Sequence, residues 1–335
     1  MRSLDLNRFA LSVCVATVML AGCGGSQPPI GAPGAMPQSA ARKTSSQDLL
    51  YADTDSGMIF VYSLPDGKFE QSFHIGLSSV LECSDAIGDV FVTSPNLSGS
   101  GSIYEFAHGG SKPVATLTDP GEPYACAVDP TTGNLAVANS SDPGNPYDPH
   151  YGDVAIYAGA QGQPTRYYSS VFTQPFSCTY DDSGNLYILA SAEGYDYPQL
   201  VRLPHGSGPF EQINVDKTIT GGVNFDPNVQ WDGKYVTVSS STNSVKDPTD
   251  IYQLSISGSH ATVVGTTELT VRAQHHGRQS WIQGNVVLGI YGPGHLNVGV
   301  WPYPKGGKPK SILKNVSNPQ DGQLWGVSIS VGSSH

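Results

Sequence analysis

Short apolar runs separated by turn residues recur along most of the chain at intervals of about fifty residues. The runs begin Asp48-Leu-Leu-Tyr-Ala-Asp, Asp89-Val-Phe-Val-Thr-Ser, Asn134-Leu-Ala-Val-Ala-Asn, Asn185-Leu-Tyr-Ile-Leu-Ala, Lys234-Tyr-Val-Thr-Val-Ser and Asn285-Val-Val-Leu-Gly-Ile. A glycine directly precedes every run but the first, and successive glycines are 45, 51, 49 and 51 residues apart. Strand-like repeats of this period are typical of a β-propeller, in which each repeat forms one four-stranded sheet, or blade.

Each repeat divides into four strands, a to d, of which strand a would line the centre of the propeller. Strand a precedes the glycine, at Leu81–Asp85, Tyr124–Asp129, Phe176–Asp181, Asn228–Asp232 and Gln279–Gln283. Strands b and c are rich in Val, Ile, Tyr and Phe and mostly alternate with period two, which predicts half-buried strands. The a–b turns carry Asp early and Gly late, an order that suits a tight hairpin with positive φ at its end.

The two ends of the repeat array complement each other. The first unit begins at strand b (Leu49–Asp53), and the last unit is followed by one spare strand, Gln323–Ser330. Pairing these strands would remove two exposed strand edges, which otherwise promote aggregation. The sequence therefore predicts an all-β, six-bladed propeller over residues 48–335, in which one C-terminal strand and three N-terminal strands complete the first blade.

The first 47 residues differ in composition from the repeats. Arg2 and Arg8 lie ahead of an apolar run, Phe9–Leu20. This run is shorter than the segment that a membrane-spanning helix needs. The run ends in Leu20-Ala-Gly-Cys23, which resembles the lipobox of bacterial lipoproteins, where cleavage occurs before the Cys and its thiol is lipidated. An ordinary secretory signal with an unrelated Cys is the alternative interpretation.

From this resemblance we expect a lipoprotein signal peptide over residues 1–22 and lipidation of Cys23. Residues 23–47 are expected to form a disordered linker, because they are rich in Gly, Pro, Ser, Gln and Ala. Several acyl chains anchor a protein stably, so the protein would be held in the bacterial cell envelope by its lipid alone.

Composition narrows the classes of partner. The net charge is −11, and only 13% of the residues are charged. An acidic surface argues against nucleic-acid binding, which requires basic patches. Residues 48–335 are enough for one large core, so we expect a monomer whose partner is a small molecule, a glycan or a protein.

Three cysteines occupy equivalent positions on strand a of consecutive blades: Cys83, Cys126 and Cys178. A redox pair or a metal-binding trio is one interpretation. We favour three buried thiols, because inner strands of neighbouring blades should lie too far apart for the ~4.4–6.8 Å Cα separation of a disulfide. Buried Cys behaves as a small apolar residue.

The b–c connections are long, at 94–101, 140–152, 191–198, 240–249 and 291–296. Variable loops on a rigid scaffold commonly bind ligands. Two of them combine Tyr rings with polar groups that suit a sugar or a peptide, and they provide the candidate contacts Tyr147, Asp148, His150, Tyr195 and Tyr197. Alternatively, these rings merely cover neighbouring loops.

His275 and Arg278 lie in the d–a connection that leads into Gln279–Gln283, at the same predicted end as the b–c loops. An Arg there could bind an anion. The adjacent pair His275-His276 is not predicted to hold a metal, because neighbouring side chains on extended chain point in opposite directions. We predict no metal, no cofactor and no catalytic residue, since no nucleophile, P-loop or metal-ligand motif is present in the sequence.

The blade sequence Cys126-Ala-Val-Asp-Pro-Thr-Thr-Gly-Asn resembles NHL/YncE-like propellers, and more closely those of uncharacterised bacterial propeller lipoproteins, over residues 48–335. Enzymes of related shape include the SMP-30 gluconolactonases and the streptogramin lyases. Gluconolactonases hold a divalent metal with one Glu, two Asn and one Asp, and Glu82, Glu122 and Asn224 do not complete that set. A binding module is therefore expected first, an SMP-30-like lactonase or lyase second, and a structural scaffold of an envelope complex third.

Overall fold

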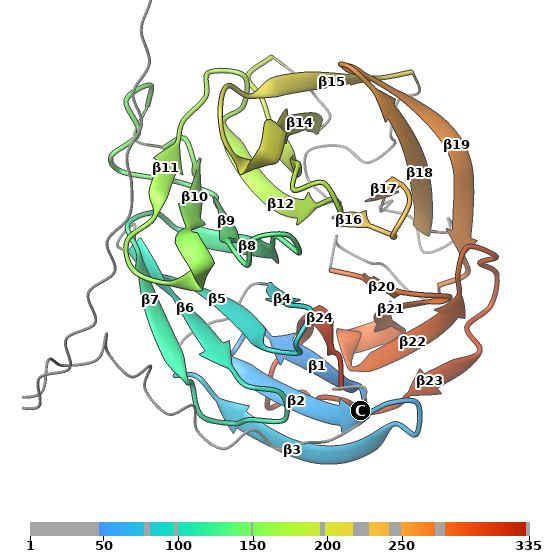
Figure 1. The fold of residues 1–335 in the computed structure, drawn as a ribbon. Coiled ribbons are helices and arrows are strands. Elements are labelled where there is room, and N and C mark those ends of the chain that lie inside the picture. Colours follow the sequence, from blue (N-terminus) through green and yellow to red (C-terminus); the bar gives the residue numbers. More distant parts are fainter. Residues whose placement is uncertain are drawn as a thin grey trace, which may run out of the picture. The chain divides into compact units, whose positions relative to one another are not determined.

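Small antiparallel sheets are arranged around a centre, as in a propeller (Figure 1). The computed structural model describes residues 47–76, 81–96, 100–148, 150–194, 198–216, 228–240, 249–271 and 279–332. These residues belong to a compact unit spanning Ser39–His335. The helical segments in the described residues are short 3-10 turns: η1 (Ala158–Ala160), η2 (Pro204–Gly206) and η3 (Pro293–His295).

The strands occupy four positions from the centre outward. The innermost are β4 (Glu82–Ser84), β8 (Pro123–Val128), β12 (Gln174–Tyr180), β16 (Val229–Trp231), β20 (Trp281–Gln283) and β24 (Leu324–Ser330). The second are β1 (Leu49–Thr54), β5 (Val90–Asn96), β9 (Leu135–Asn139), β13 (Leu186–Ser191), β17 (Val236–Ser240) and β21 (Val286–Tyr291). The third are β2 (Met58–Ser63), β6 (Ser100–Phe106), β10 (Asp153–Tyr157), β14 (Gln199–Leu203), β18 (Thr249–Ser257) and β22 (Asn297–Pro302). The outermost are β3 (Lys68–His74), β7 (Ala115–Asp119), β11 (Thr165–Tyr167), β15 (Glu211–Val215), β19 (His260–Leu269) and β23 (Ser311–Leu313).

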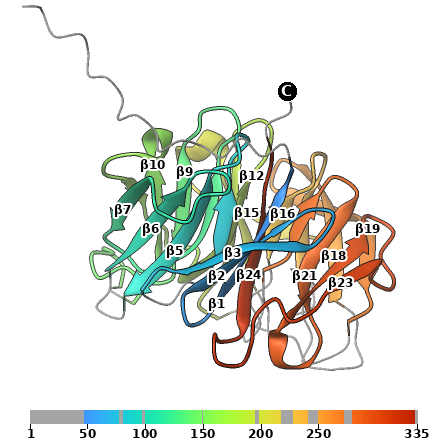
Figure 2. The same ribbon diagram turned by 90° about the horizontal axis from the view of Figure 1, so that it is seen from below.

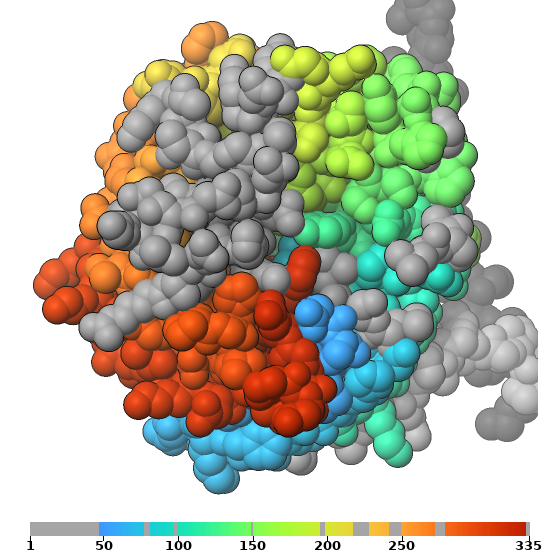
Figure 3. Space-filling view, turned by 180° about the vertical axis from the view of Figure 1, so that it is seen from behind, coloured from blue at the N-terminus to red at the C-terminus, as the bar shows by residue number. Residues whose placement is uncertain are grey.

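The predicted pairing of the two chain ends is confirmed. Strand β24 runs antiparallel to β1, with Leu50 opposite Ile329 and Ala52 opposite Val327, and forms one sheet in the order β24-β1-β2-β3 (Figure 2). Around Asp55 the chain also bonds the segment that precedes β24, since the Asp55 N–H donates to the Gln323 carbonyl (3.1 Å). In Figure 3 the blue segment near the start of the described chain lies against the red segment near its end.

Within the described ranges, four sheets contain four strands each, and a fifth contains eight in the order β12-β13-β14-β15-β19-β18-β17-β16. Its two halves are joined at their outer strands, where β15 and β19 pair in parallel at only two positions, Asn214 with His260 and Val215 with Ala261. The Asn214 N–H also donates to the Ser259 carbonyl (2.8 Å). The joint was not predicted, because it depends on the long β19 reaching a neighbouring outer strand.

The turns after the inner strands have the predicted backbone. Gly88, Gly133, Gly184, Gly233 and Gly284 all have positive φ, between 56° and 91°. L-residues with a side chain rarely adopt this conformation, so the repeated glycine is a geometric requirement of the turn. We call the end of the molecule that carries these turns the turn end, and the opposite end, which carries 140–152, the loop end.

The prediction of half-buried strands was wrong for the middle of the sheets. Every residue of β1, β9 and β10 is buried, on both faces, because each sheet packs against a neighbour on either side. Alternation is seen in other strands, such as β6 in the third position and the outer strands β3 and β7. In the described part of the chain, no helix has the length and apolar character needed to cross a membrane.

Candidate functional site

The inner strands surround a cavity of about 510 Å³. Its lining comes from β4, β8, β12, β16, β20 and β24 and from the turns that follow β4, β8 and β12, so it lies toward the turn end. Trp281 of β20 packs against the core cluster that contains Cys83 and Cys126 and also against the cluster around β1 and β24. Trp281 therefore contacts both of the neighbouring cores that border this part of the cavity.

Side chains on or beside the cavity wall link neighbouring inner strands by hydrogen bonds. The hydroxyls of Ser177 and Thr179 on β12 accept hydrogen bonds from the backbone of β16 (2.9 and 3.1 Å). Asn228 lies just before β16, and its side-chain amide N–H donates to the Ser280 carbonyl (2.8 Å). Gln230 lies on β16, and its side-chain amide N–H donates to the Ile282 carbonyl (3.1 Å). All four pairs are 52 residues apart in sequence, so the sequence period places each donor beside its acceptor.

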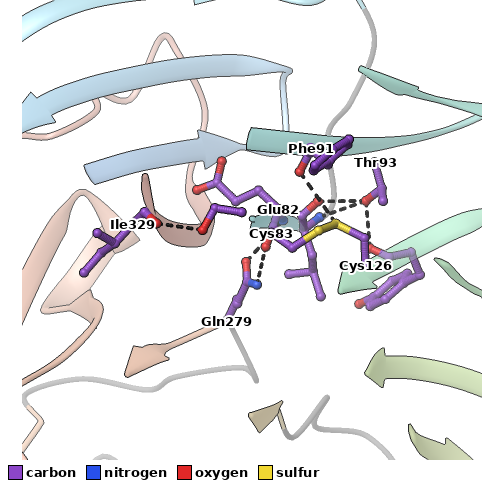
Figure 4. Close-up of a disulfide and its surroundings, with 10 residues drawn as sticks. Glu82, Cys83, Phe91, Thr93, Cys126, Gln279 and Ile329 are labelled. Carbon is purple, nitrogen blue, oxygen red and sulfur yellow. Dashed lines mark hydrogen bonds between the residues drawn. A yellow bond between two sulfur atoms is a disulfide. The ribbon is translucent and has the colours of Figure 1, made fainter. Parts of the chain in front are cut away.

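Cys83 and Cys126 form a disulfide beside the cavity, with their Cα atoms 5.7 Å apart (Figure 4). The prediction of three buried thiols was wrong for this pair, because adjacent inner strands approach each other more closely at the centre than we expected. The Cys126 sulfur also lies 3.6 Å from the Phe91 carbonyl oxygen.

Cys178 is a buried free thiol, as predicted. It packs with Ala125 and Ala127, the neighbours of Cys126 on β8, whose side chains point away from the disulfide. Strand β8 thus separates this thiol from the disulfide. Burial raises the pKa of the Cys178 thiol to about 12, so it is protonated and unreactive at neutral pH.

The repeated turns place a carboxylate after each of four inner strands. Asp85 Oδ1 accepts from the backbone N–H groups of Ile87 and Asp89 (3.0 and 2.8 Å). Further turn carboxylates accept backbone N–H bonds in the same way: Asp129 from Thr131, Asp181 from Ser183 and Asn185, and Asp232 from Lys234 and Tyr235. The hairpin chemistry therefore surrounds the turn end with negative charge.

A second group of carboxyls is buried where β24 and β1 meet β4. Asp53 and Glu82 are both fully buried. Burial, and then the charge of Asp53, raise the pKa of the Glu82 carboxyl well above its usual range, while hydrogen bonds from Ser328 partly offset the rise. Gln279 fixes the backbone beside it, donating to the Glu82 carbonyl (2.6 Å) (Figure 4).

At the loop end, buried polar groups form a network beneath residues 140–152. The Asn139 amide donates to Asp119 (2.9 Å) and to Asp153 (2.7 Å). Arg166 donates to Asp153 (3.2 Å) and pairs with Asp142 in the loop. Burial raises the pKa of Asp153 to about 7, with a smaller contribution from Asp119.

The network and local turns order the loop that carries three of the predicted contacts. Asn145 donates to the Gly152 carbonyl (2.8 Å) and accepts from the Tyr147 N–H (2.9 Å). Tyr147 is 57% exposed. His150 and Asp148 contact each other (2.9 Å), and bonds from the His150 backbone and ring lower the pKa of Asp148.

The remaining predicted contacts, Tyr195, Tyr197, His275 and Arg278, lie outside the described residues, as does Cys23. The loops that contain Tyr151 and Glu193 are adjacent, since the Tyr151 hydroxyl donates a hydrogen bond to the Glu193 carboxylate (3.3 Å). Sequence reasoning missed the cavity residues Ile87, Trp231 and Trp281. Their signal was their place on or shortly after a strand a.

In the described ranges, no three His, Cys, Asp or Glu side chains converge in a way that could hold a metal ion. Neither family models nor curated protein sequences match the chain. The structure resembles a functionally unknown protein from Desulfotomaculum acetoxidans, with a TM-score of 0.54 and 12% identity over 86% of this chain and 100% of that one. A chain of a mitotic checkpoint complex gives 0.47 and 15% identity over 72% of this chain and 67% of that one, a similarity too low to support an argument. At these identities the likeness concerns the fold alone.

Proposed function

We propose that this protein is a non-catalytic binding module of the cell envelope, built on a six-bladed, NHL/YncE-like propeller. The blade count treats the eight-stranded sheet as two blades, because β15 and β19 meet at only two residue pairs while each half has its own four-stranded order. The single observation that supports binding is the central cavity of about 510 Å³. Its size is within the range of pockets that hold small organic ligands.

The cavity rather than the loops is the favoured ligand site. It combines walls held rigid by the hydrogen bonds between inner strands with partly exposed rings of Trp231 and Trp281. Rigid walls reduce the ordering that a ligand must impose, which favours affinity.

Binding can be tested with a library of neutral, cationic and anionic small molecules, using the shift of the thermal unfolding midpoint. Compounds that raise the midpoint are then titrated while tryptophan emission is recorded. We expect Trp231→Phe to remove most of the emission change and Trp301→Phe, a control for a fully buried ring, to retain it. Chelator-sensitive hydrolysis of sugar lactones by the purified protein would contradict the non-catalytic proposal.

The loop end is a second candidate surface, suited to a glycan or a protein. The observation that favours it is the exposed Tyr147 ring on a loop fixed by the Asn145 and Asp142 bonds. Tyr195, Tyr197, His275 and Arg278 would extend this surface, together with Asp148 and His150.

Anchoring through Cys23 completes the proposal. Its support is the lipobox-like Leu20-Ala-Gly-Cys23 that follows the apolar run. Cys23→Ala should release the protein from membranes or block its processing, whereas Cys14→Ala serves as the control within the signal segment. Normal membrane retention of Cys23→Ala would show that another segment is the anchor.

A further inference from the structure

The charge of the cavity lining has one sign. Asp85, Asp129 and Asp182 contribute to the lining, from three different turns, and among the described residues that line it none is Lys, Arg or His. The backbone hydrogen bonds to Asp85 and Asp129 orient these carboxylates without cancelling their charge. Asp182 is exposed and free of such a turn role, because Asp181 accepts the turn hydrogen bonds instead.

A concave surface of one sign concentrates the electrostatic potential at its mouth. Low-dielectric walls focus the field and raise the local concentration of oppositely charged molecules. Here the field favours cations and opposes anions. It adds to the acidic net charge of the whole chain, −11.

A ligand in the cavity would contact mainly apolar groups of its wall. Asn228 and Gln230, two of its polar side chains, already bond the neighbouring inner strand. Ile87 at the mouth is 58% exposed, and the Trp231 and Trp281 rings are partly exposed. Tryptophan faces attract both flat apolar groups and organic cations.

We infer that the cavity takes a small organic cation, a molecule with a flat apolar body and an amine or ammonium group. The body contacts Trp231, Trp281 and Ile87, and the charged group lies among Asp85, Asp129 and Asp182. The inference rests on the proposed binding function and adds the chemical class of its ligand.

Three compounds that share one flat body test the charge preference: 2-naphthylmethylamine, 2-naphthalenemethanol and 2-naphthoate. Calorimetric titration of the full mature chain should show the amine binding about tenfold more tightly than the alcohol, a difference of about 1.4 kcal/mol. The naphthoate should bind most weakly. The affinity of the amine should fall as salt is raised from about 50 mM to about 500 mM, whereas that of the alcohol should not.

Asp182→Asn is the informative variant, because it removes charge without removing a turn hydrogen bond. It should weaken binding of the amine about fivefold and leave the alcohol unchanged. Asp66→Asn is the matched control, since Asp66 is also an exposed hairpin Asp but does not line the cavity.

Failure of the inference is distinguishable from failure of the binding function. The cation preference would be overturned if the three compounds bound with equal affinity or if the amine did not bind. It would also be overturned if the affinity of the amine changed neither with salt nor in Asp182→Asn. Binding of other library compounds at the cavity would in those cases leave the binding function standing. The absence of any ligand in the whole library would count against the binding function itself.

Discussion

The turn end and the loop end of the molecule use carboxylates in different ways. At the turn end, Asp85 and Asp129 sit on repeated short turns and border a cavity. At the loop end, Asp119 and Asp153 are fully buried beneath a long loop and share Asn139, while Arg166 bonds Asp153. The repeat thus produces an open, negatively charged mouth at one end, and a single inserted loop produces a closed polar network at the other.

Because of this difference, ligand binding and stability should depend on different carboxylates. Carboxylates at the mouth should govern which ligands enter, with small effects on folding. Carboxylates in the closed network should govern stability and its pH dependence, because burial penalises their charged form. Variants of one region, measured for both stability and binding, therefore show whether the other region is affected.

The largest effect is expected from removing β24, which runs from one end of the molecule to the other. Truncation after Gln320 deletes a strand that pairs with β1 along its whole length and opens the ring. We expect loss of cooperative unfolding and of any ligand binding, seen by circular dichroism and calorimetry. A truncated protein with an unchanged thermal transition would show that closure is dispensable.

The second largest effect is expected from removing the disulfide. Cys83 and Cys126 are 43 residues apart, and the chain-entropy model for such a loop gives about 4 kcal/mol of stabilisation. Replacing both by Ser should lower the free energy of unfolding by roughly that amount, measured by urea denaturation. Cys178→Ser is the control, because it removes a buried thiol but no crosslink. Equal effects of the two changes would mean that the crosslink contributes little.

Asp153 should make stability depend on pH. Its pKa of about 7 lies above the value near 3.9 of an unfolded Asp, so between these pH values the folded protein holds a proton that the unfolded chain has released. The free energy of unfolding should therefore fall as pH rises from about 4 to 7, by about 1.4 kcal/mol for each unit of pKa difference at most.

Asp153→Asn tests this contribution, since the amide cannot ionise. Its stability should vary less across this pH range than that of the wild type, in urea denaturation at each pH. Glu82→Gln is a useful comparison at the other buried carboxyl site, where the raised pKa gives the same sign. An unaltered pH profile in Asp153→Asn would place the titrating group elsewhere.

The smallest effect on stability is expected from Tyr147→Ala, at an exposed loop position. The free energy of unfolding should change by less than about 0.5 kcal/mol, because exposed side chains contribute little to the core. A larger loss would mean that the ring covers its loop instead of facing a partner.

Local patterns in the sequence were sufficient to predict the strand order and the turn glycines, because these depend on nearest-neighbour chemistry. The pairing of β24 with β1 followed from the missing strand at one end and the spare strand at the other. The disulfide could not be predicted in this way, since it depends on how closely β4 and β8 approach at the centre.

The buried network left a signal that our interpretation did not use. Asn139 and Asp153 each stand at the end of an otherwise apolar strand, and Asp119 ends β7, at positions where a buried polar side chain needs a partner. Their mutual contact is long-range, since Asp119 and Asp153 come from strands of different sheets. The cavity is equally a product of packing among six inner strands, which no single repeat reveals.

The central claim is that ligands bind at the turn end, and one labelling experiment tests it. Ile87→Cys and Tyr147→Cys introduce thiols at positions of matched exposure, 58% and 57%, at opposite ends of the molecule. The native Cys178 is buried and should not react. Each variant is coupled to a bulky maleimide and titrated with the tightest binder of the naphthalene series or of the library. We predict that the label at position 87 abolishes binding and the label at position 147 leaves it intact; the reverse result would contradict the account.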